Sequence, residues 1–399
     1  MSGPLTGYTV IDMSRYIAGP YCSMLLGDLG ANVIKVERRA VGEDSRGLLP
    51  FKKVGDDSVS LYFTQYNKNK RSLTVDFRNP ESIELLKKLI AKADVLVENF
   101  RAGTMDKMGL SKEALKEINP SLVVTHISGF GQDGPYKDRA AFDCIGQAMG
   151  GLMGVTGENG GDPLLVGTWA GDFTTAIYAA YGTVSALLHK EKTGEGQHLD
   201  LSLVECTSTI LATAIPNYVA NGVIQPRRGN RDDVTGPANL FKCKDGNIYL
   251  HAGTDPLFKR LCKAMGKPEI AEDERYNVVA KRMKCIEEVE AIVQQWIGNL
   301  TTNEAEAALV EVGVPVTKIA DVSDIVNNPM LQHRKAIGYV EYPGVGEIAV
   351  PGICVKMSET PGEIRYRPPL LGEHNEEILK EYLNLSDDEI KKLYERKII

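Results

Sequence analysis

Residues 8–37 read YTVIDMSRYIAGPYCSMLLGDLGANVIKVE. This stretch predicts a short strand over Tyr8–Asp12 and a helix over Tyr21–Leu29, which follows the turn Gly19-Pro20 and stops at Gly30. A second strand follows over Ala31–Glu37. Apolar strands that alternate with helices indicate a parallel sheet covered on both faces.

The same alternation continues along the chain. Ligands of such α/β folds collect at the carboxyl ends of the strands, so we expect the loops after Asp12, Glu37, Glu98 and Ser128 to matter. The further predicted strands are Ser72–Phe77, Asp94–Glu98, Leu122–Ser128 and His198–Leu203, with helices over Glu81–Lys92 and Ser111–Ile118.

The composition changes after residue 220. Residues 221–238 are rich in Pro, Arg and Asp, which is typical of an exposed loop at a domain boundary. We therefore predict a large domain over 1–220, a smaller α+β domain over 221–328, and a return to the large domain over 329–399. Helices are expected at Pro256–Met265, Lys281–Ile297 and Thr302–Val312 in the middle part.

Charge and hydropathy exclude several classes of protein. The 399 residues carry a net charge of −7, so the chain has no basic excess for nucleic acid. No apolar run is long enough for a membrane span, and the N-terminus does not look like a signal peptide. The seven cysteines contain no CxxC pair, which indicates buried thiols, no metal site and a cytoplasmic protein.

A glycine-rich loop follows the strand at Leu122–Ser128. Its GxGxxG pattern, from Gly129 and Gly131 to Gly134, is followed by Pro135 and polar residues. A dinucleotide fingerprint requires a helix N-terminus there, so a nicotinamide site is disfavoured. A loop that lets backbone approach a ligand is the preferred interpretation, with a plain turn as the alternative.

Asp172 is the candidate for chemistry. It follows Gly167-Thr-Trp-Ala-Gly171 and precedes a helical pattern in which Ile177, Tyr181, Val184 and Leu188 recur every three or four residues. The pattern predicts Asp172 at the helix N-cap, where a carboxylate is favoured. A capping role alone would explain an aspartate at this position. An ionised carboxylate beside a thioester can also attack the thioester carbonyl.

Basic residues cluster near the predicted loops. They are either solvated surface charge or a patch for a polyphosphate such as the 3′-phospho-ADP of coenzyme A. These residues are Arg38, Lys68, Lys70, Arg71 and Arg101.

Short motifs along nearly the whole chain together resemble the class III CoA-transferase family, which includes formyl-CoA and carnitine CoA-transferases. The motifs include Ala18-Gly19-Pro20, Asn69-Lys-Arg-Ser72, Ala93-Asp-Val-Leu-Val-Glu-Asn-Phe-Arg101, Gly171-Asp172 and Leu371-Gly-Glu-His374.

The resemblance implies a Rossmann-like large domain built from both chain ends, a small middle domain, and an interlocked homodimer. It also implies transfer of CoA from an acyl-CoA to a free carboxylic acid, with the CoA thioester as substrate and no permanent cofactor or metal. The family's nucleophile falls on Asp172. The resemblance implies that the reaction proceeds through an aspartyl anhydride and an aspartyl-CoA thioester.

The CoA-binding positions of the family can be carried over in the same way. They fall on Tyr16, Ile17, Ala18, Arg38, Val75, Arg78, Asn99, Phe100, Arg101, Lys107, Arg139 and Asp143.

Departures from the family pattern bear on the substrate. The glycine run of the oxalate branch is absent from residues 229–236, and Ile17 replaces a glutamine, so oxalate is disfavoured. A carnitine-like, 2-hydroxy or branched acid is a possible acceptor, and Arg228 or Arg231 is a candidate partner for its carboxylate. Gly129 and Gly131 are the other substrate-loop candidates.

Two alternatives share this resemblance. An α-methylacyl-CoA racemase of the same fold needs a histidine where residues 140–145 read AAFDCI, so one of its two bases is missing. A non-catalytic acyl-CoA binder is the other alternative, and the presence of Asp172 argues against it.

Overall fold

The computed structural model describes residues 3–399, and the chain divides into two compact units. Of the described residues, unit 1 contains 3–152, 165–215 and 329–399, and unit 2 contains 153–164 and 216–328. Two of the four divisions fall within helices, namely α7 (Leu152–Val155) and α10 (Ala214–Asn221). Unit 1 is thus assembled from segments far apart in the sequence, including both ends of the chain.

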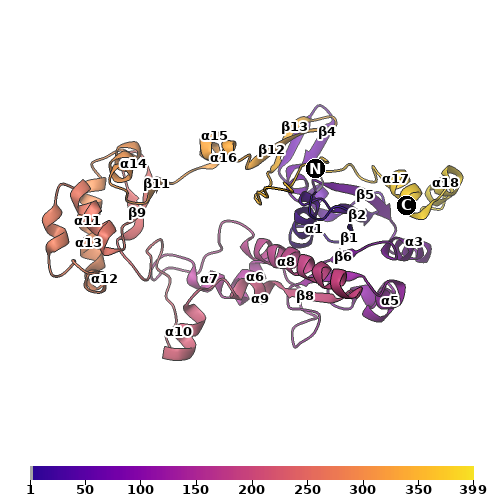
Figure 1. The fold of residues 1–399 in the computed structure, drawn as a ribbon, viewed down its shortest axis with the longest axis horizontal. Helices are drawn as coiled ribbons and strands as arrows, with labels where there is room; N and C mark the ends of the chain where they lie inside the picture. Colours follow the sequence, from indigo (N-terminus) through magenta and orange to yellow (C-terminus); the bar gives the residue numbers. More distant parts are fainter. Residues whose placement is uncertain (1–2) are drawn as a thin grey trace. The chain divides into compact units, whose positions relative to one another are not determined.

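A six-stranded parallel sheet forms the centre of unit 1 (Figure 1). All five strand pairings are parallel. Counted along the chain, the spatial order is 3-2-1-4-5-6, which is the order of a doubly wound sheet with its switch point between the first and fourth strands. In that order the strands are β5 (Lys70–Val75), β2 (Asn32–Arg38), β1 (Thr9–Asp12), β6 (Val95–Glu98), β7 (Val123–Ser128) and β8 (His198–Ser202).

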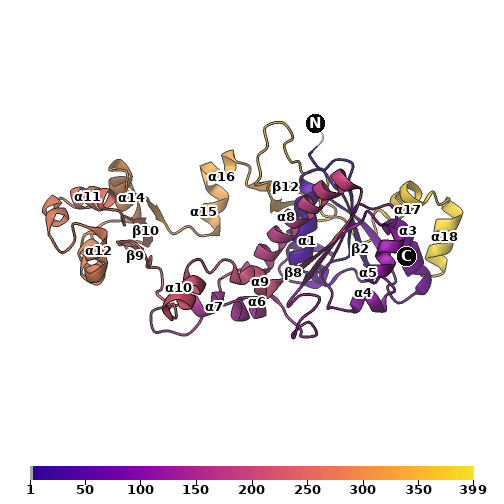
Figure 2. The same ribbon diagram turned by 60° about the horizontal axis from the view of Figure 1, so that its bottom comes forward.

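Alternate strand residues fill two separate cores. Val10, Val33 and Val95 pack against α1 (Ala18–Asp28) and α8 (Ala170–Thr193) on one face. Ile11 and Ile34 point to the other face, because successive side chains of a strand alternate. That second face is covered by α3 (Pro80–Ile90), α5 (Lys112–Ile118), α17 (Asn375–Leu383) and α18 (Asp387–Glu395), as Figure 2 shows.

Helix α8 buries its small residues and exposes its large apolar ones. Ala176, Ala179 and Thr183 face the sheet, whereas Ile177 and Tyr181 are exposed, together with Val184 and Leu188. The large apolar residues do repeat at helical spacing, but α8 packs closely on α1 and the sheet through its small residues. The helical repeat is therefore confirmed, and its large apolar residues form an exposed stripe on the surface of unit 1.

The buried basic residues correct one expectation. Lys70 Nζ lies 2.8 Å from Asp12 Oδ2, and Lys68 pairs with Asp28. Arg71 pairs with glutamates of α17. These three cations stabilise unit 1 internally and are not available as a phosphate patch.

The remaining elements of unit 1 are short. Four of them form two hairpins, β3–β4 and β12–β13, which were not predicted as such. They are η1 (Asp44–Gly47), β3 (Phe51–Val54), β4 (Asp57–Ser60), α2 (Leu61–Thr64), α4 (Thr104–Lys107), α6 (Asp143–Met149), α9 (Leu203–Ser208), α16 (Pro329–His333), β12 (Ile337–Tyr342) and β13 (Gly346–Pro351).

Unit 2 is a small α+β body with its own core. Its antiparallel sheet has the order β11–β10–β9, and Phe241, Ile248 and Leu250 pack against the helices. Its elements are β9 (Ala238–Lys242), β10 (Asn247–His251), α11 (Asp255–Ala264), η2 (Pro268–Glu272), α12 (Val279–Arg282), η3 (Met283–Cys285), α13 (Ile286–Ile297), α14 (Thr302–Glu311), β11 (Val316–Lys318) and α15 (Val322–Asn327).

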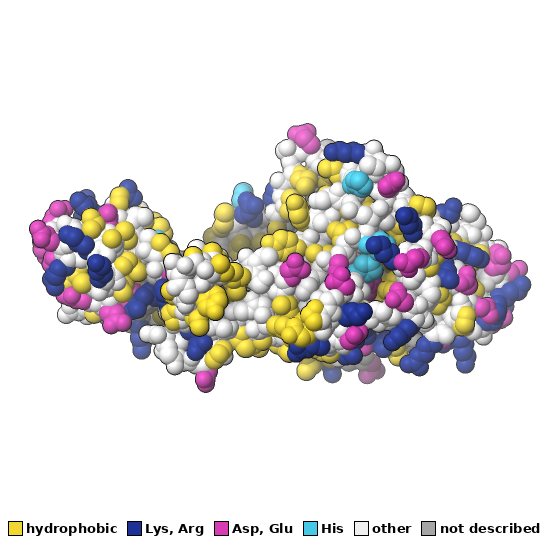
Figure 3. Space-filling view, turned by 90° about the horizontal axis from the view of Figure 1, so that it is seen from below, with side chains coloured by type: hydrophobic (Ala, Val, Ile, Leu, Met, Phe, Trp, Pro, Cys, Tyr) yellow, Lys and Arg dark blue, Asp and Glu magenta, His cyan; other side chains and the backbone are white. Residues whose placement is uncertain are grey.

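Two surface properties complete the description. Positive and negative side chains are interspersed on the face drawn in Figure 3, with hydrophobic side chains exposed among them. Among the described residues, no helix combines the length and the apolar character that a membrane crossing requires.

Candidate active site

A cavity of about 200 Å³ lies at the carboxyl ends of β1, β6 and β7, at the switch point of the sheet. The loop after β1 and the loop after β6 form two of its walls, and the glycine-rich loop after β7 forms a third. Asp172, from the first turn of α8, lies in the same wall as Phe142 and Leu203. We call this space the switch-point cavity.

The switch-point cavity brings together most of the residues predicted from the sequence. Tyr16, Ile17, Ala18, Asn99, Phe100, Arg101, Gly129, Arg139 and Asp172 all line it.

Other predicted residues lie elsewhere. Arg38 is outside the cavity wall, and its guanidinium pairs with Asp44 at 2.7 Å. The Val75 side chain is fully buried in the core of the sheet. Arg78 and Lys107 are exposed and also outside the wall. Gly131 lines a separate shallow hollow beside Asp133 and Asp200.

The two arginines of the small-unit loop already have partners within unit 2. Arg228 forms an ion pair with Asp233, and Arg231 makes a two-pronged contact with Glu290 at 2.6–3.2 Å. A substrate carboxylate would compete with these carboxylates for either guanidinium group.

The cavity contains cations that the sequence did not single out. Arg15 and Lys137 line it in addition to Arg101 and Arg139. Arg15 pairs with Asp44, but Arg101, Lys137 and Arg139 form no ion pair with any residue in 3–399. Three unpaired cations in one concave wall suit a polyphosphate. The position of Arg15 in the loop after the first strand could have identified it as a cavity residue from the sequence.

The loop after β1 is held in an unusual conformation. Tyr16 has φ +65°, which is the left-handed region and uncommon for a residue with a side chain. Asn99 fixes the neighbouring residue, because its side chain accepts from Arg15 N–H at 2.8 Å and donates to Arg15 C=O at 2.7 Å. Glu43 accepts the Tyr16 N–H at 3.3 Å. These contacts position the cavity wall before any ligand binds.

Gly129 makes a close approach possible in the glycine-rich loop. A Cβ at this position would lie 2.3 Å from Ala141 Cβ, so any side chain would displace the wall formed by residues 140–142. After Gly134 the chain forms turns and no helix until α6 begins at Asp143. The loop therefore lacks the helix N-terminus that a dinucleotide site needs.

Asp172 is not the N-cap of α8. Trp169 occupies that position, and Asp172 is the third residue of the helix. The ring centroids of Tyr62 and Trp169 are 5.4 Å apart, and those of Tyr21 and Phe173 are 5.0 Å apart. This aromatic cluster fixes the first turn of α8, and hence the place of the carboxylate.

Asp143 lies directly beside Asp172. Its Oδ1 accepts the backbone N–H of Asp172 at 3.0 Å, and its Oδ2 accepts from Gln147 Nε2 at 2.6 Å. Gly171 permits this approach, because a Cβ there would lie 3.1 Å from Asp143 Oδ1. Asp143 is thus a positioning residue beneath Asp172 and does not line the switch-point cavity.

The surroundings of Asp172 make its carboxylate unusually basic. Burial, reinforced by the charge of Asp143, raises its pKa from 3.8 to about 7. The sequence favoured the ionised form through the helix dipole, and the structure reverses that expectation because desolvation outweighs the dipole. A more basic carboxylate is a stronger nucleophile.

A second and wider cavity, of about 600 Å³, opens on another side of Asp172. Tyr62, Leu165, Val166 and Trp169 give it a largely apolar wall, with Gln147 as a polar group. Asp172 therefore lies where two spaces meet, one rich in cations and one largely apolar. No histidine lines either cavity among the described residues.

The comparisons with known proteins agree with this geometry. The model of CoA-transferase family III matches residues 5–375. The chain is 37% identical to the succinyl-CoA–L-malate CoA-transferase alpha subunit of Chloroflexus aurantiacus, over 99% of this chain and 92% of that one. It is 35% identical to succinyl-CoA:glutarate CoA-transferase of Homo sapiens, over 98% and 88% of the two chains.

A solved structure has the same fold. The crystal structure of a CaiB/BaiF family protein from Brucella suis superposes with a TM-score of 0.86 at 36% identity, covering 96% of this chain and all of that one. The chain belongs to CoA-transferase family III. It is an enzyme of acyl-CoA:carboxylate CoA transfer, as the resemblance implied.

Proposed function

We propose that Asp172 is the nucleophile of this transfer reaction. The observation that carries the proposal is a carboxylate with a pKa near 7 at the junction of a cation-lined cavity and an apolar one. CoA would occupy the switch-point cavity with its phosphates on Arg101, Lys137 and Arg139. The acyl group would lie over Asp172 in the wider cavity.

The proposed reaction has four acyl transfers. The Asp172 carboxylate attacks the thioester carbonyl and releases CoA thiolate, which leaves a mixed anhydride. The thiolate attacks the aspartyl carbonyl of this anhydride, so the donor acid departs and an aspartyl-CoA thioester remains. The acceptor carboxylate attacks that thioester and gives a second anhydride and CoA thiolate. Attack of the thiolate on the acceptor carbonyl releases the new acyl-CoA and free Asp172.

For the substrates, we propose succinyl-CoA as donor and a 2-hydroxy or dicarboxylic acid as acceptor. The support is that the similar transferases are named for succinyl-CoA with L-malate, D-citramalate and glutarate. The first two of these acids are 2-hydroxy acids, one of the acceptor types considered from the sequence. The missing glycine run argues against oxalate.

We also propose a homodimer. The exposed stripe on α8, formed by Ile177, Tyr181, Val184 and Leu188, is the support, because a helix usually buries such a stripe against a partner. Free thiols at all seven cysteines are in keeping with a cytoplasmic location. Chromatography with light scattering tests the dimer, and Tyr181→Lys should shift it toward monomer.

The decisive experiment traps the intermediate on the protein. The enzyme is mixed with succinyl-CoA, then with hydroxylamine, and peptides are analysed by mass spectrometry. An aspartyl thioester would give a hydroxamate at Asp172, whereas Asp172→Asn would give none and would lose CoA transfer. Asp143→Asn is the matched control, since it should slow the reaction but keep the label on Asp172. A label on another residue would overturn the proposal.

Two further measurements, deuterium exchange and acyl-CoA binding, separate the alternatives. Deuterium exchange at the α-carbon of a 2-methylacyl-CoA, without transfer, would indicate a racemase. Binding without label, transfer or exchange would indicate a non-catalytic acyl-CoA binder.

A further inference from the structure

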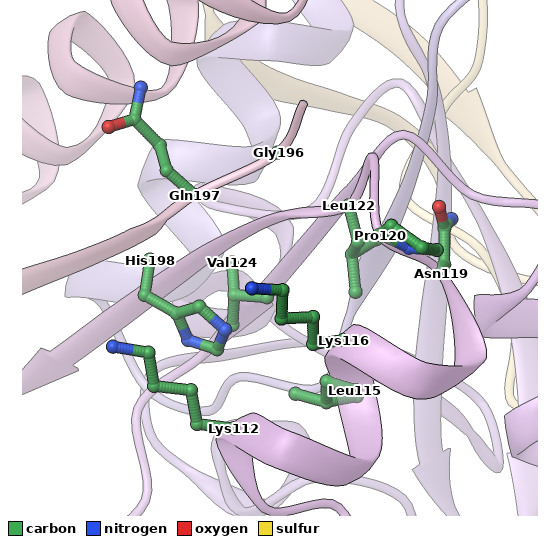
Figure 4. Close-up of a pocket in the computed structure, with 10 residues that line it drawn as sticks. All are labelled: Lys112, Leu115, Lys116, Asn119, Pro120, Leu122, Val124, Gly196, Gln197 and His198. Atoms are coloured by element: carbon green, nitrogen blue, oxygen red, sulfur yellow. The ribbon is translucent and has the colours of Figure 1, made fainter. Parts of the chain in front are cut away.

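A third cavity, of about 290 Å³, lies at the amino ends of β7 and β8 beside α5 (Figure 4). It is at the opposite edge of the sheet from Asp172, because parallel strands have all their carboxyl ends on one side. Leu115, Leu122 and Val124 form an apolar floor and are themselves buried. We call this space the α5 cavity.

Two lysines line the α5 cavity above this floor. Lys112 and Lys116 are four residues apart on α5, so their side chains share one face of the helix. Figure 4 shows both side chains extending toward His198, while Gln197 points away from them. Neither ammonium group has an ion-pair partner within residues 3–399.

The histidine on this wall adds no positive charge at neutral pH. Burial, together with the neighbouring His126, lowers the pKa of His198 to about 4, so its ring is neutral at pH 7. His198 Nδ1 is 3.0 Å from His126 Nε2, and His126 Nδ1 is 2.6 Å from Glu98 Oε1. The His198 ring is therefore held in a fixed position, and the two lysines supply the positive charge of the cavity.

We propose that the α5 cavity binds a small organic carboxylate. The carboxylate group would pair with Lys112 and Lys116, and the hydrocarbon part would lie on Leu115, Leu122 and Val124. The apolar floor favours such an amphipathic anion over inorganic phosphate, which has no part to bury there. The site is separate from CoA transfer, and its ligand is of the same chemical class as the free acids that this family of enzymes handles.

The hydrogen-bonded histidines also connect the α5 cavity to the wall of the switch-point cavity. Glu98 Oε2 accepts the N–H of Phe100 at 2.7 Å, and Phe100 lines that cavity. The contacts therefore run from His198 through His126 and Glu98 to Phe100. The imidazole rings of His198 and His126 lie close to the proposed ligand, so their NMR signals can report its binding.

The test uses the whole protein with labelled histidine and hexanoate as the probe. Saturable NMR shifts of the His198 signal, assigned with His198→Gln, are expected. Lys112→Gln with Lys116→Gln should weaken hexanoate binding about tenfold or more, since two charge-assisted contacts are lost. Lys391→Gln with Lys392→Gln is the control of equal charge change on α18, and it should leave the affinity unchanged.

Three results would overturn the proposal. One is an unchanged affinity in the Lys112/Lys116 double variant. The others are equal binding of neutral hexanol, or equal binding of inorganic phosphate. Asp172→Ala must retain the His198 shift, so a failed nucleophile proposal and a failed α5 cavity proposal remain distinguishable.

Discussion

Asp172→Asn should make unit 1 more stable at pH 8 while it abolishes CoA transfer. The folded protein holds the Asp172 proton with a pKa of about 7, against 3.8 for an unperturbed aspartate. Between these pH values the folded state binds more protons than the unfolded state. Wild-type stability therefore falls as pH rises from about 4 to about 7, and it falls no further above that. The uncharged amide avoids this loss.

The magnitude follows from the same two pKa values. Each tenfold change in proton affinity corresponds to about 1.4 kcal/mol, so the full difference is about 4 kcal/mol. Asp172 keeps part of its surface exposed, and solvent screening reduces the effect to about 2 kcal/mol. We expect the variant to gain about this much at pH 8 and little at pH 4, where the folded state is protonated and Asp172 is ionised in only about half of the unfolded chains.

Urea denaturation of the wild type and the variant at pH 4, 6 and 8 measures this difference. Asp138→Asn, an exposed aspartate, is the control and should show no gain. A gain of the same size at pH 4 would refute the reasoning, because it would reflect amide packing and not the buried charge. An independent readout is the pH profile of wild-type kcat/KM, which should rise with an apparent pKa near 7.

Other variants test the switch-point cavity and the core. Arg139→Gln should raise the KM for acyl-CoA about tenfold with little change in kcat, measured by steady-state kinetics, since it removes a contact present before and during reaction. Gly129→Val should abolish CoA binding in calorimetry while circular dichroism is unchanged, because its Cβ would collide with Ala141. Lys70→Met should cost about 3 kcal/mol in urea denaturation, because it leaves the buried Asp12 carboxylate without its nearest cation.

The strands of unit 1 could be predicted because they are apolar runs bounded by turns. Five of the six predicted ranges match within one residue at each end, and the range Ser72–Phe77 is displaced by two residues because β5 begins at the buried Lys70. A lysine at the start of a strand looks like a loop residue, and its burial is explained by its ion pair with Asp12 and its hydrogen bonds to Pro20 C=O and Asn67.

The site was predictable in position but not in chemistry. Asp172 and the loops after β1 and β6, which line the candidate site, were predicted from sequence patterns and the family resemblance. The basicity of Asp172 could not be found, since it depends first on the burial of the carboxyl group and then on Asp143, which lies 29 residues away and meets Asp172 only in the folded chain. The sequence also did not show which side of α8 is buried, because that side is formed by small residues such as Ala176 and Ala179.

The route of the chain through unit 1 has a consequence for synthesis on the ribosome. Asn375 binds the backbone of Thr74 on the outer strand β5, and Ile378, Ile390 and Ile398 complete the core beneath that end of the sheet. A nascent chain that has reached residue 330 carries all six strands but none of these residues. Its sheet then has a bare edge and an uncovered apolar face, so this stage of translation is the one most in need of a chaperone.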